Sequence, residues 1–166
     1  MSSSRTLVAI LALALAGCGF KMRGSADLPF ETLYIPQQKS GIGLDLKRTI
    51  EAGTSAKVVD DPRKAQAIMQ ITQESRGKQI LSLTGAGRVS EHQLTYTLVF
   101  RVHDGKGGDF VASNTVQLAR DLTYSDAQIL AKEWEEQLLF KDMETQAVQQ
   151  ILRRLSGAKT PKPAAP

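Results

Sequence analysis

The sequence predicts a single α+β domain of two layers, in which two helices pack on one side of a mostly antiparallel four-stranded sheet. Two observations lead to this fold class. Apolar residues alternate along several runs in the middle of the chain, and a long helical stripe follows the last of them. Strands that follow one another, with the helices segregated, are typical of α+β domains. We expect the domain over residues 30–157, with the C-terminal helix the longer of the two.

A short strand and a helix are expected at the start of this domain. Residues 32–35 form a β-rich run that stops at Pro36. Leu46 and Ile50 then keep the i, i+4 spacing of one helix face. The spacing predicts the first helix over 43–52.

Three segments of mixed character precede the longest strand. Residues 57–59 are a candidate short strand before an Asp-Asp-Pro turn. Alternation of apolar and polar residues predicts a half-buried strand over 67–74. The glycine-containing segment 84–90 is expected to be a loop.

A β-hairpin is the clearest element in the chain. One face of its first strand carries five apolar or aromatic side chains: Leu94, Tyr96, Leu98, Phe100 and Val102. Residues 104–109 are rich in glycine and aspartate and are expected to form the connection. Residues 110–122 then return as the partner strand.

The last element is a long helix, expected over 126–155. Ser125 is a suitable N-cap, and Gln128 three residues later fits a capping box. Gly157 ends the helix. Apolar residues at helical spacing predict a stripe that packs into the core, with Trp134 as part of it. Its members are Ile129, Leu130, Trp134, Leu138, Met143, Val148, Ile151, Leu152 and Leu155.

The N-terminus has the pattern of a cleaved secretory signal over residues 1–17. Arg5 precedes an apolar run of about ten residues, too short to span a bilayer. The run ends in Leu-Ala-Gly before Cys18, which resembles the bacterial lipoprotein box. This resemblance implies a diacylglycerol on Cys18, with residues 18–29 as a lipidated tether. Enteric lipoproteins retained in the inner membrane usually have aspartate after the cysteine. This chain has Gly19 there, and in this it resembles lipoproteins sent to the outer membrane.

Composition excludes several classes of protein. Cys18 is the single cysteine, so an internal disulfide or a cysteine-rich zinc site is excluded. The net charge of +4 falls to +3 when Arg5 leaves with the signal, and no basic face with interleaved aromatics indicates a nucleic-acid partner. Residues 158–166 are small, basic and Pro-rich, and we expect this tail to be disordered.

No catalytic or metal-binding constellation is present in the sequence, and we expect a protein that is not an enzyme and has no cofactor. His92 and His103 lack metal-ligand spacing and are interpreted as ordinary strand residues. The acid pairs at 60–61 and 135–136 are adjacent in sequence, and adjacent helical residues do not face each other. They are interpreted as solvated surface. The glycines at 85 and 87 lack the strand–helix context of a phosphate loop.

Three basic residues near the expected hairpin ends are candidates for binding a phosphorylated ligand. Arg88 lies before the long strand, Arg120 near the end of the return strand, and Lys132 in the second turn of the long helix. Together they could line one end of the sheet, where clustered cations neutralise a multiply charged phosphate group.

Four segments, in this order and spacing, carry a resemblance to a known family. They are Cys18-Gly19-Phe20-Lys21-Met22-Arg23-Gly24, Gly87-Arg88-Val89-Ser90-Glu91-His92-Gln93-Leu94, Ala131-Lys132-Glu133-Trp134-Glu135-Glu136, and 150–155. Over about 18–156 the chain resembles the lipopolysaccharide-assembly lipoproteins of the LptE family. The resemblance implies a sheet of four strands packed by two helices.

The resemblance also implies an assembly role without catalysis. Family members plug the outer-membrane barrel LptD at a one-to-one ratio, assist its folding and contact lipopolysaccharide. Their basic side chains in the loop before the long strand and at the start of the long helix are implicated in that contact, and Lys132 matches the second position. At the loop position of the enteric arginine this chain has Gly85, and Arg88 is assigned in its place. A scaffold for another envelope complex and a lipid-anchored enzyme remain as alternatives.

Overall fold

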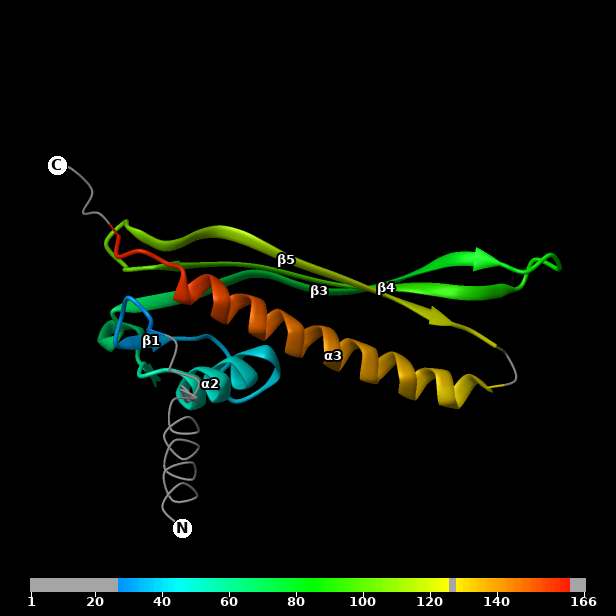
Figure 1. Ribbon diagram of the computed structural model, residues 1–166, viewed down its shortest axis with the longest axis horizontal. Helices are drawn as coiled ribbons and strands as arrows, with labels where there is room; N and C mark the ends of the chain where they lie inside the picture. The colour runs from blue at the N-terminus through cyan, green and yellow to red at the C-terminus, as the bar shows by residue number, and fades with distance from the viewer. Residues whose placement is uncertain (1–26, 126–127, 162–166) are drawn as a thin grey trace, which may run out of the picture.

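Three long strands and a long helix make up most of the structure, and shorter elements close one end of it (Figure 1). The computed structural model describes residues 27–125 and 128–161. The predicted signal peptide, Cys18 and residues 162–166 of the predicted tail lie outside these ranges. In chain order the elements are β1 Thr32–Tyr34, α2 Gly41–Gly53, β2 Lys57–Val59, the 3-10 turn η1 Pro62–Lys64, β3 Ala67–Leu83, β4 Val89–His103, β5 Asp109–Thr123 and α3 Ile129–Ser156.

The sheet has five strands in the order β2-β1-β3-β4-β5, one more than predicted. The additional strand is β2, the candidate run at 57–59, which pairs in parallel with β1 through Leu33 and Val58. A run of three residues is too short for the sequence pattern to show whether it joins the sheet. β1 is also parallel to β3, whereas β3, β4 and β5 form an antiparallel meander. The predicted α+β class and the mostly antiparallel pairing of the long strands are confirmed.

β3 is twice as long as predicted. The expectation ended at residue 74, but the strand continues to Leu83 and pairs with β4 along its length. The second half was missed because Arg76, Gly77 and Lys78 interrupt the apolar alternation. The charged side chains of Arg76 and Lys78 face the helix layer, as described below, so this strand does not follow the usual rule that inward-facing residues are apolar.

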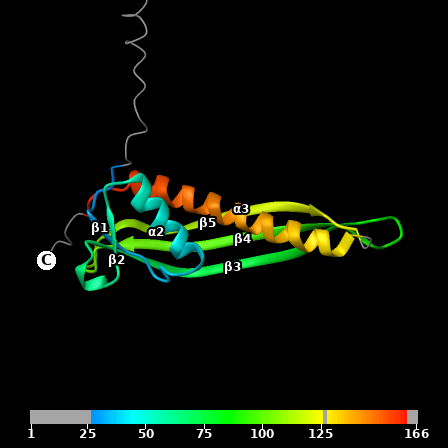
Figure 2. The same cartoon turned by 90° about the horizontal axis from the view of Figure 1, so that it is seen from below.

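Both helices cover the same face of the sheet, as predicted (Figures 1 and 2). α2 is one or two residues longer at each end than the predicted 43–52. α3 begins at Ile129, with Gln128 as an N-cap residue whose side chain makes no capping hydrogen bond. The predicted capping box is therefore wrong: the Gln128 main-chain N–H donates to the carbonyl of Ser125 at 3.0 Å.

The apolar core lies between β4 and the second half of α3. Every second residue of β4 is fully buried: Leu94, Tyr96, Leu98, Phe100 and Val102. α2 contributes Ile42, Leu46 and Ile50, and α3 contributes residues between Phe140 and Leu155. The predicted face of the hairpin strand is therefore confirmed as the core face.

The loop between β1 and α2 lies very close to the helix that follows it. A Cβ at Gly43 would come within 2.4 Å of the carbonyl oxygen of Pro36, so no side chain fits there. Gln37, in the same loop, has a φ of 54°, a conformation rare for residues other than glycine. The chain thus turns sharply into α2 and seals the end of the core.

A network of charged side chains crosses the interface between sheet and helices. Glu144 of α3 is only 4% exposed. It accepts a hydrogen bond from Arg76 of β3 and lies 3.6 Å from Lys141, which also contacts Asp45 of α2 at 2.6 Å. The hydrogen bond to Asp45 is the main cause that raises the pKa of Lys141 above its usual range. One buried carboxylate therefore links β3, α3 and, through lysine, α2.

Removing the arginine from this network should destabilise the fold. Arg76→Ala leaves the buried Glu144 with the more distant Lys141, and an under-satisfied buried acceptor costs about 1–3 kcal/mol. We expect the free energy of unfolding in urea to fall by that amount. Arg63→Ala, which breaks the exposed pair with Asp61, is the control and should change it by less than about 0.5 kcal/mol. Equal effects of the two changes would contradict this account.

Tyr96 should make stability depend on alkaline pH. Burial, followed by the 2.9 Å hydrogen bond to Glu74, raises the pKa of its phenol above the usual range. The stabilisation that this raised pKa provides is complete below about pH 10, the pKa of the phenol in the unfolded chain. It is lost as the pH rises above that value. Between pH 9 and 11 the unfolding free energy of Tyr96→Phe should therefore fall less than that of the wild type. A Tyr96→Phe variant that keeps the wild-type slope would contradict this account.

Candidate functional site

The first half of α3 is held on the sheet mainly by charged side chains. Glu136 binds Lys78 of β3 at 2.5 Å, and Asp142 binds Arg120 of β5 at 3.1 Å. The buried residues of the helix begin only at Phe140. The region from the start of α3 to the β3–β4 turn, here called the distal end, therefore differs from the apolar end around α2.

Lys132 points toward the sheet. Its amino group donates to the hydroxyl of Thr123 at 2.9 Å and to Glu135 at 2.7 Å, and its side chain is 14% exposed. It borders a cavity of about 90 Å³ between the first turns of α3 and the sheet. The cavity is lined by Lys78, Leu122, Tyr124, Ile129, Lys132, Glu133 and Glu136. An anion reaching Lys132 must compete with the Glu135 carboxylate.

Arg120 lies further along the helix than Lys132. Its guanidinium donates to Asp142 and to the carbonyl of Ala119. Asp142 is ten positions after Lys132, which corresponds to roughly 15 Å along a helix. The structure therefore places these two predicted cations along one face and does not bring them to a common point.

Arg88 lies in the turn between β3 and β4. Its main-chain carbonyl accepts from Thr84 at 2.7 Å, which closes the turn. Its side chain forms no ion pair with any residue that the structure describes. At Gly85 a Cβ would meet nothing within 4 Å, and φ there is not in the left-handed region. A side chain at position 85 would therefore be tolerated.

Large apolar side chains are exposed at the distal end. On α3, Leu130, Trp134 and Leu138 are 74%, 72% and 70% exposed. The prediction that Trp134 packs in the core with the rest of the apolar stripe is therefore wrong. The i, i+4 spacing makes these three residues a continuous row, here called the apolar ridge. Ile80, Leu81 and Leu83 are also exposed on β3. Exposed apolar groups of this size usually mark a contact surface.

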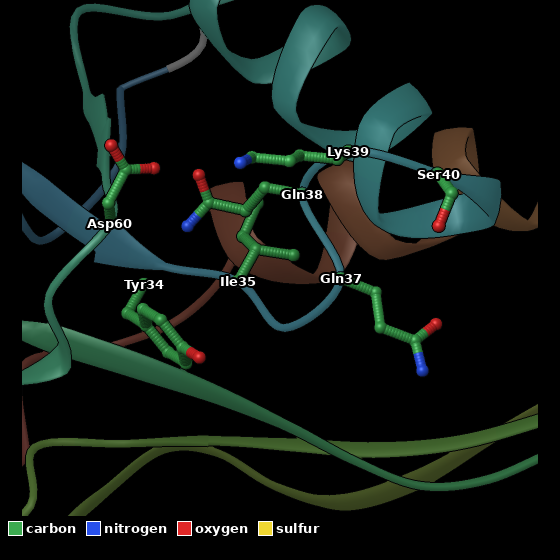
Figure 3. Close-up of a pocket in the computed structure, with 7 residues that line it drawn as sticks. All are labelled: Tyr34, Ile35, Gln37, Gln38, Lys39, Ser40 and Asp60. Atoms are coloured by element: carbon green, nitrogen blue, oxygen red, sulfur yellow. The ribbon is translucent and has the colours of Figure 1, made fainter.

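The sequence did not indicate a second hollow, at the opposite end of the sheet (Figure 3). It has a volume of about 500 Å³ and lies beside the β1–α2 loop. Its lining residues are Tyr34, Ile35, Gln37, Gln38, Lys39, Ser40 and Asp60. Gln38 is already bonded, donating to the carbonyl of Val59 and accepting from Lys47. The hollow brings no nucleophile and base together.

The residues weighed as catalytic candidates are engaged elsewhere. Glu135 and Glu136 diverge as predicted, since they bind Lys132 and Lys78 respectively. The ring of His92 packs edge-on against Tyr124, 5.2 Å between centroids. Across residues 27–125 and 128–161, no group of histidine, cysteine and acidic side chains is arranged to hold a metal ion. Within the same ranges no helix is long and apolar enough to cross a membrane.

Comparison with known proteins gives a family match over almost the whole described domain. Residues 30–155 match the family described as "LptE: Lipopolysaccharide-assembly". The chain is 30% identical over 162 residues to the LPS-assembly lipoprotein LptE of Yersinia enterocolitica, covering 91% of this chain and 75% of that protein. It is 28% identical over 155 residues to the protein of the same name from Pectobacterium atrosepticum, covering 90% and 83%.

Solved structures agree with this fold. The solution structure of an uncharacterized lipoprotein B from Nitrosomonas europaea is 45% identical, with a TM-score of 0.72, covering 84% of this chain and 91% of that one. The crystal structure of the rare lipoprotein B of Shewanella oneidensis has a TM-score of 0.65 at 23% identity, covering 76% and 94%. The second likeness concerns the fold alone.

Proposed function

The chain belongs to the LptE lipopolysaccharide-assembly family, and on that premise we propose that it is a non-enzymatic outer-membrane lipoprotein that plugs the barrel LptD. In this role it is lipidated on Cys18, faces the periplasm, assists barrel assembly and helps deliver lipopolysaccharide to the outer leaflet. The observation that carries the proposal is the family match over residues 30–155. Several acyl chains on Cys18 make a stable membrane anchor, at about 0.8 kcal/mol per buried methylene.

The surface of the domain is suited to the lumen of a barrel. Side chains on the sheet face away from the helices are mainly uncharged and polar, for example Thr95, Thr97 and Gln117. Gln79 and Gln93 bond to each other across this face at 2.8 Å. A large barrel encloses an aqueous interior, so a plug needs an outer surface of this kind. The apolar ridge then supplies a local contact with the barrel wall.

The distal end is the proposed lipopolysaccharide contact. Lys132 and Arg88 supply positive charge at the helix start and at the turn, and Arg120 adds to it along β5. Phosphate oxygens accept charge-assisted hydrogen bonds from such groups. The exposed Ile80 and Leu83 offer apolar surface near the same turn. A ligand that carries both phosphates and acyl chains matches this combination.

Isolation from native envelopes tests the role as a whole. The tagged, lipidated protein is recovered in detergent, bound proteins are identified by mass spectrometry, and lipopolysaccharide is assayed in the same eluate. We expect LptD at a near one-to-one ratio, with lipopolysaccharide present. Recovery of a different envelope complex would overturn the proposal and favour a general scaffold.

Reversing the charge at position 132 should weaken binding of lipopolysaccharide. Lys132→Glu removes a donor and places a carboxylate beside Glu135, so we expect at least about a tenfold loss of affinity. Circular dichroism should be unchanged, because the first half of α3 contributes little to the apolar core. Unchanged affinity with an unchanged spectrum would contradict the assignment. Gly85→Arg is the complementary variant: it places an arginine at the family position in open space and should raise affinity a few-fold.

Shortening the centre of the apolar ridge should weaken the complex with LptD. Trp134 is 72% exposed, so Trp134→Ala should change the unfolding free energy by no more than about 0.5 kcal/mol. Buried at an interface, a tryptophan contributes about 2 kcal/mol or more, and recovery of LptD should fall steeply. Gln137→Ala, an exposed change on the same helix, is the control and should leave recovery unaltered. If both variants retain LptD equally, the ridge is not the contact.

A further inference from the structure

The sheet has two long strands with an open edge, and the two edges differ in how their main chain is covered. β5 is the last strand of the sheet among the described residues. Arginine side chains occupy two of its carbonyls: Arg120 donates to Ala119 at 2.8 Å and Arg154 to Thr115 at 3.1 Å. Such capping removes acceptors that an added strand would use. The β5 edge is therefore partly blocked.

The β3 edge is open for most of its length. β1 pairs with β3 only at Ala67 and Ile68, and within the described residues no strand lies beside Gln70–Leu83 on that side. In the same part of the chain no side chain bonds to a main-chain atom of this stretch. Unpaired N–H and C=O groups in a row are a template for strand addition.

The direction of these groups follows from the pairing of β4. The N–H of Tyr124 donates to the carbonyl of Ser90 at 2.8 Å, in line with the β4–β5 register. Residues of an antiparallel strand bond alternately to one neighbour and the other. Thr95, an odd number of positions from Ser90, therefore bonds to β3, where its partner is Gly77.

It follows that Arg76 and Lys78, on either side of Gly77, direct their main-chain groups away from β4 and toward the open edge. Their side chains do not cover that edge. Arg76 reaches Glu144, and Lys78 reaches Glu136, both on α3. The side chains that commonly protect an edge strand are thus drawn across the sheet by the helix.

A regular stretch of eight residues is available for pairing. The β3–β4 register is continuous from Gln73 to Ile80 and is interrupted by irregularities on both sides. A hollow of about 200 Å³ adjoins the start of this stretch, where β1 leaves the sheet. Its lining residues are Pro36, Gln37, Ile71, Thr72, Gln73 and Glu74. It provides room for a side chain of an added strand that continues the line of β1.

Charge decides between a second copy of the chain and a different protein. Suppose that two copies pair antiparallel near the centre of this stretch. Arg76 of one copy then lies opposite Arg76 or Lys78 of the other, or the two Lys78 residues lie opposite each other. Like charges directly opposite are destabilising. An incoming strand with an acidic or uncharged residue opposite Arg76 and Lys78 has no such penalty.

We propose that the Gln73–Ile80 edge of β3 receives an extended, uncharged or acidic segment of the barrel protein as an added strand. The inference rests on the proposed function for the identity of the partner. It differs from the contact through the apolar ridge because main-chain hydrogen bonds, and not apolar side chains, carry the recognition.

Amide hydrogen exchange on the full-length protein, free and in complex with co-produced LptD, tests this directly. In the free monomer the amides of Arg76 and Lys78 should exchange rapidly, while that of Gly77, bonded to β4, is protected. In the complex the two edge amides should slow at least about tenfold. A complex that forms while both amides exchange at the free rate overturns the inference and leaves the proposed function standing. Absence of any complex refutes the proposed function instead, and the inference with it.

Proline substitution separates main-chain pairing from side-chain effects. Lys78→Pro and Lys78→Ala both remove the ion pair with Glu136, but only proline removes the outward N–H. We expect proline to lower LptD recovery at least about tenfold further than alanine, which removes the ion pair but keeps the outward N–H. Ile80→Pro against Ile80→Ala repeats the comparison at a position with no ion pair, in case Lys78→Pro fails to fold. Equal recovery within each pair, or slow edge amides in a concentration-dependent dimer of the free chain, would refute the inference.

Discussion

A helix that is longer than the core beneath it governs this structure. α3 has 28 residues, roughly 42 Å of helix, but its buried residues begin only at Phe140, three turns into the helix. The first half is attached in another way. Lys78 and Arg120 of the sheet form ion pairs with acidic residues of α3, and Lys132 of α3 donates a hydrogen bond to Thr123. Because the face of α3 turned to the sheet carries these polar contacts, the apolar residues of that half lie on its outer face, where they form the ridge.

How far the sequence predicts this arrangement depends on which element is considered. β4 was assigned correctly because its core-facing residues are all apolar and alternate without interruption. The same rule stopped β3 at residue 74, since the inward residues after it are charged and find their partners on a helix 58 or more positions away. Periodicity also assigned Trp134 to the same stripe as the core residues of α3, but the structure leaves its side chain 72% exposed. Whether such a stripe is covered depends on where the helix sits on the sheet, which no local pattern encodes.

The candidate site shows the same division. Each of the three cations was found from its place near an expected strand or helix end, and Lys132 and Arg88 also from the family resemblance. Their separation could not be predicted, because it depends on the position of α3 along β5. Nor did the sequence assign Glu135 as the counter-ion of Lys132, although the i, i+3 spacing is a usable signal for such pairs. In the candidate site, Lys132 and Arg120 are therefore already paired with acidic side chains, which an anionic ligand would have to displace.

The attachment of α3 and the exposure of the β3 edge have a common cause. Arg76 and Lys78 lie in the one stretch of β3 with a regular register, and each is directed to a glutamate of α3. If these side chains turned outward, they would cover the β3 edge. On the β5 edge, Arg120 and the α3 residue Arg154 do this by donating to main-chain carbonyls. Within the described residues, a helix held by its own ion pairs therefore leaves a row of unpaired main-chain groups along the edge of β3. An open edge of this kind favours aggregation in a protein that works alone, and it is tolerable in one whose edge is covered by a partner.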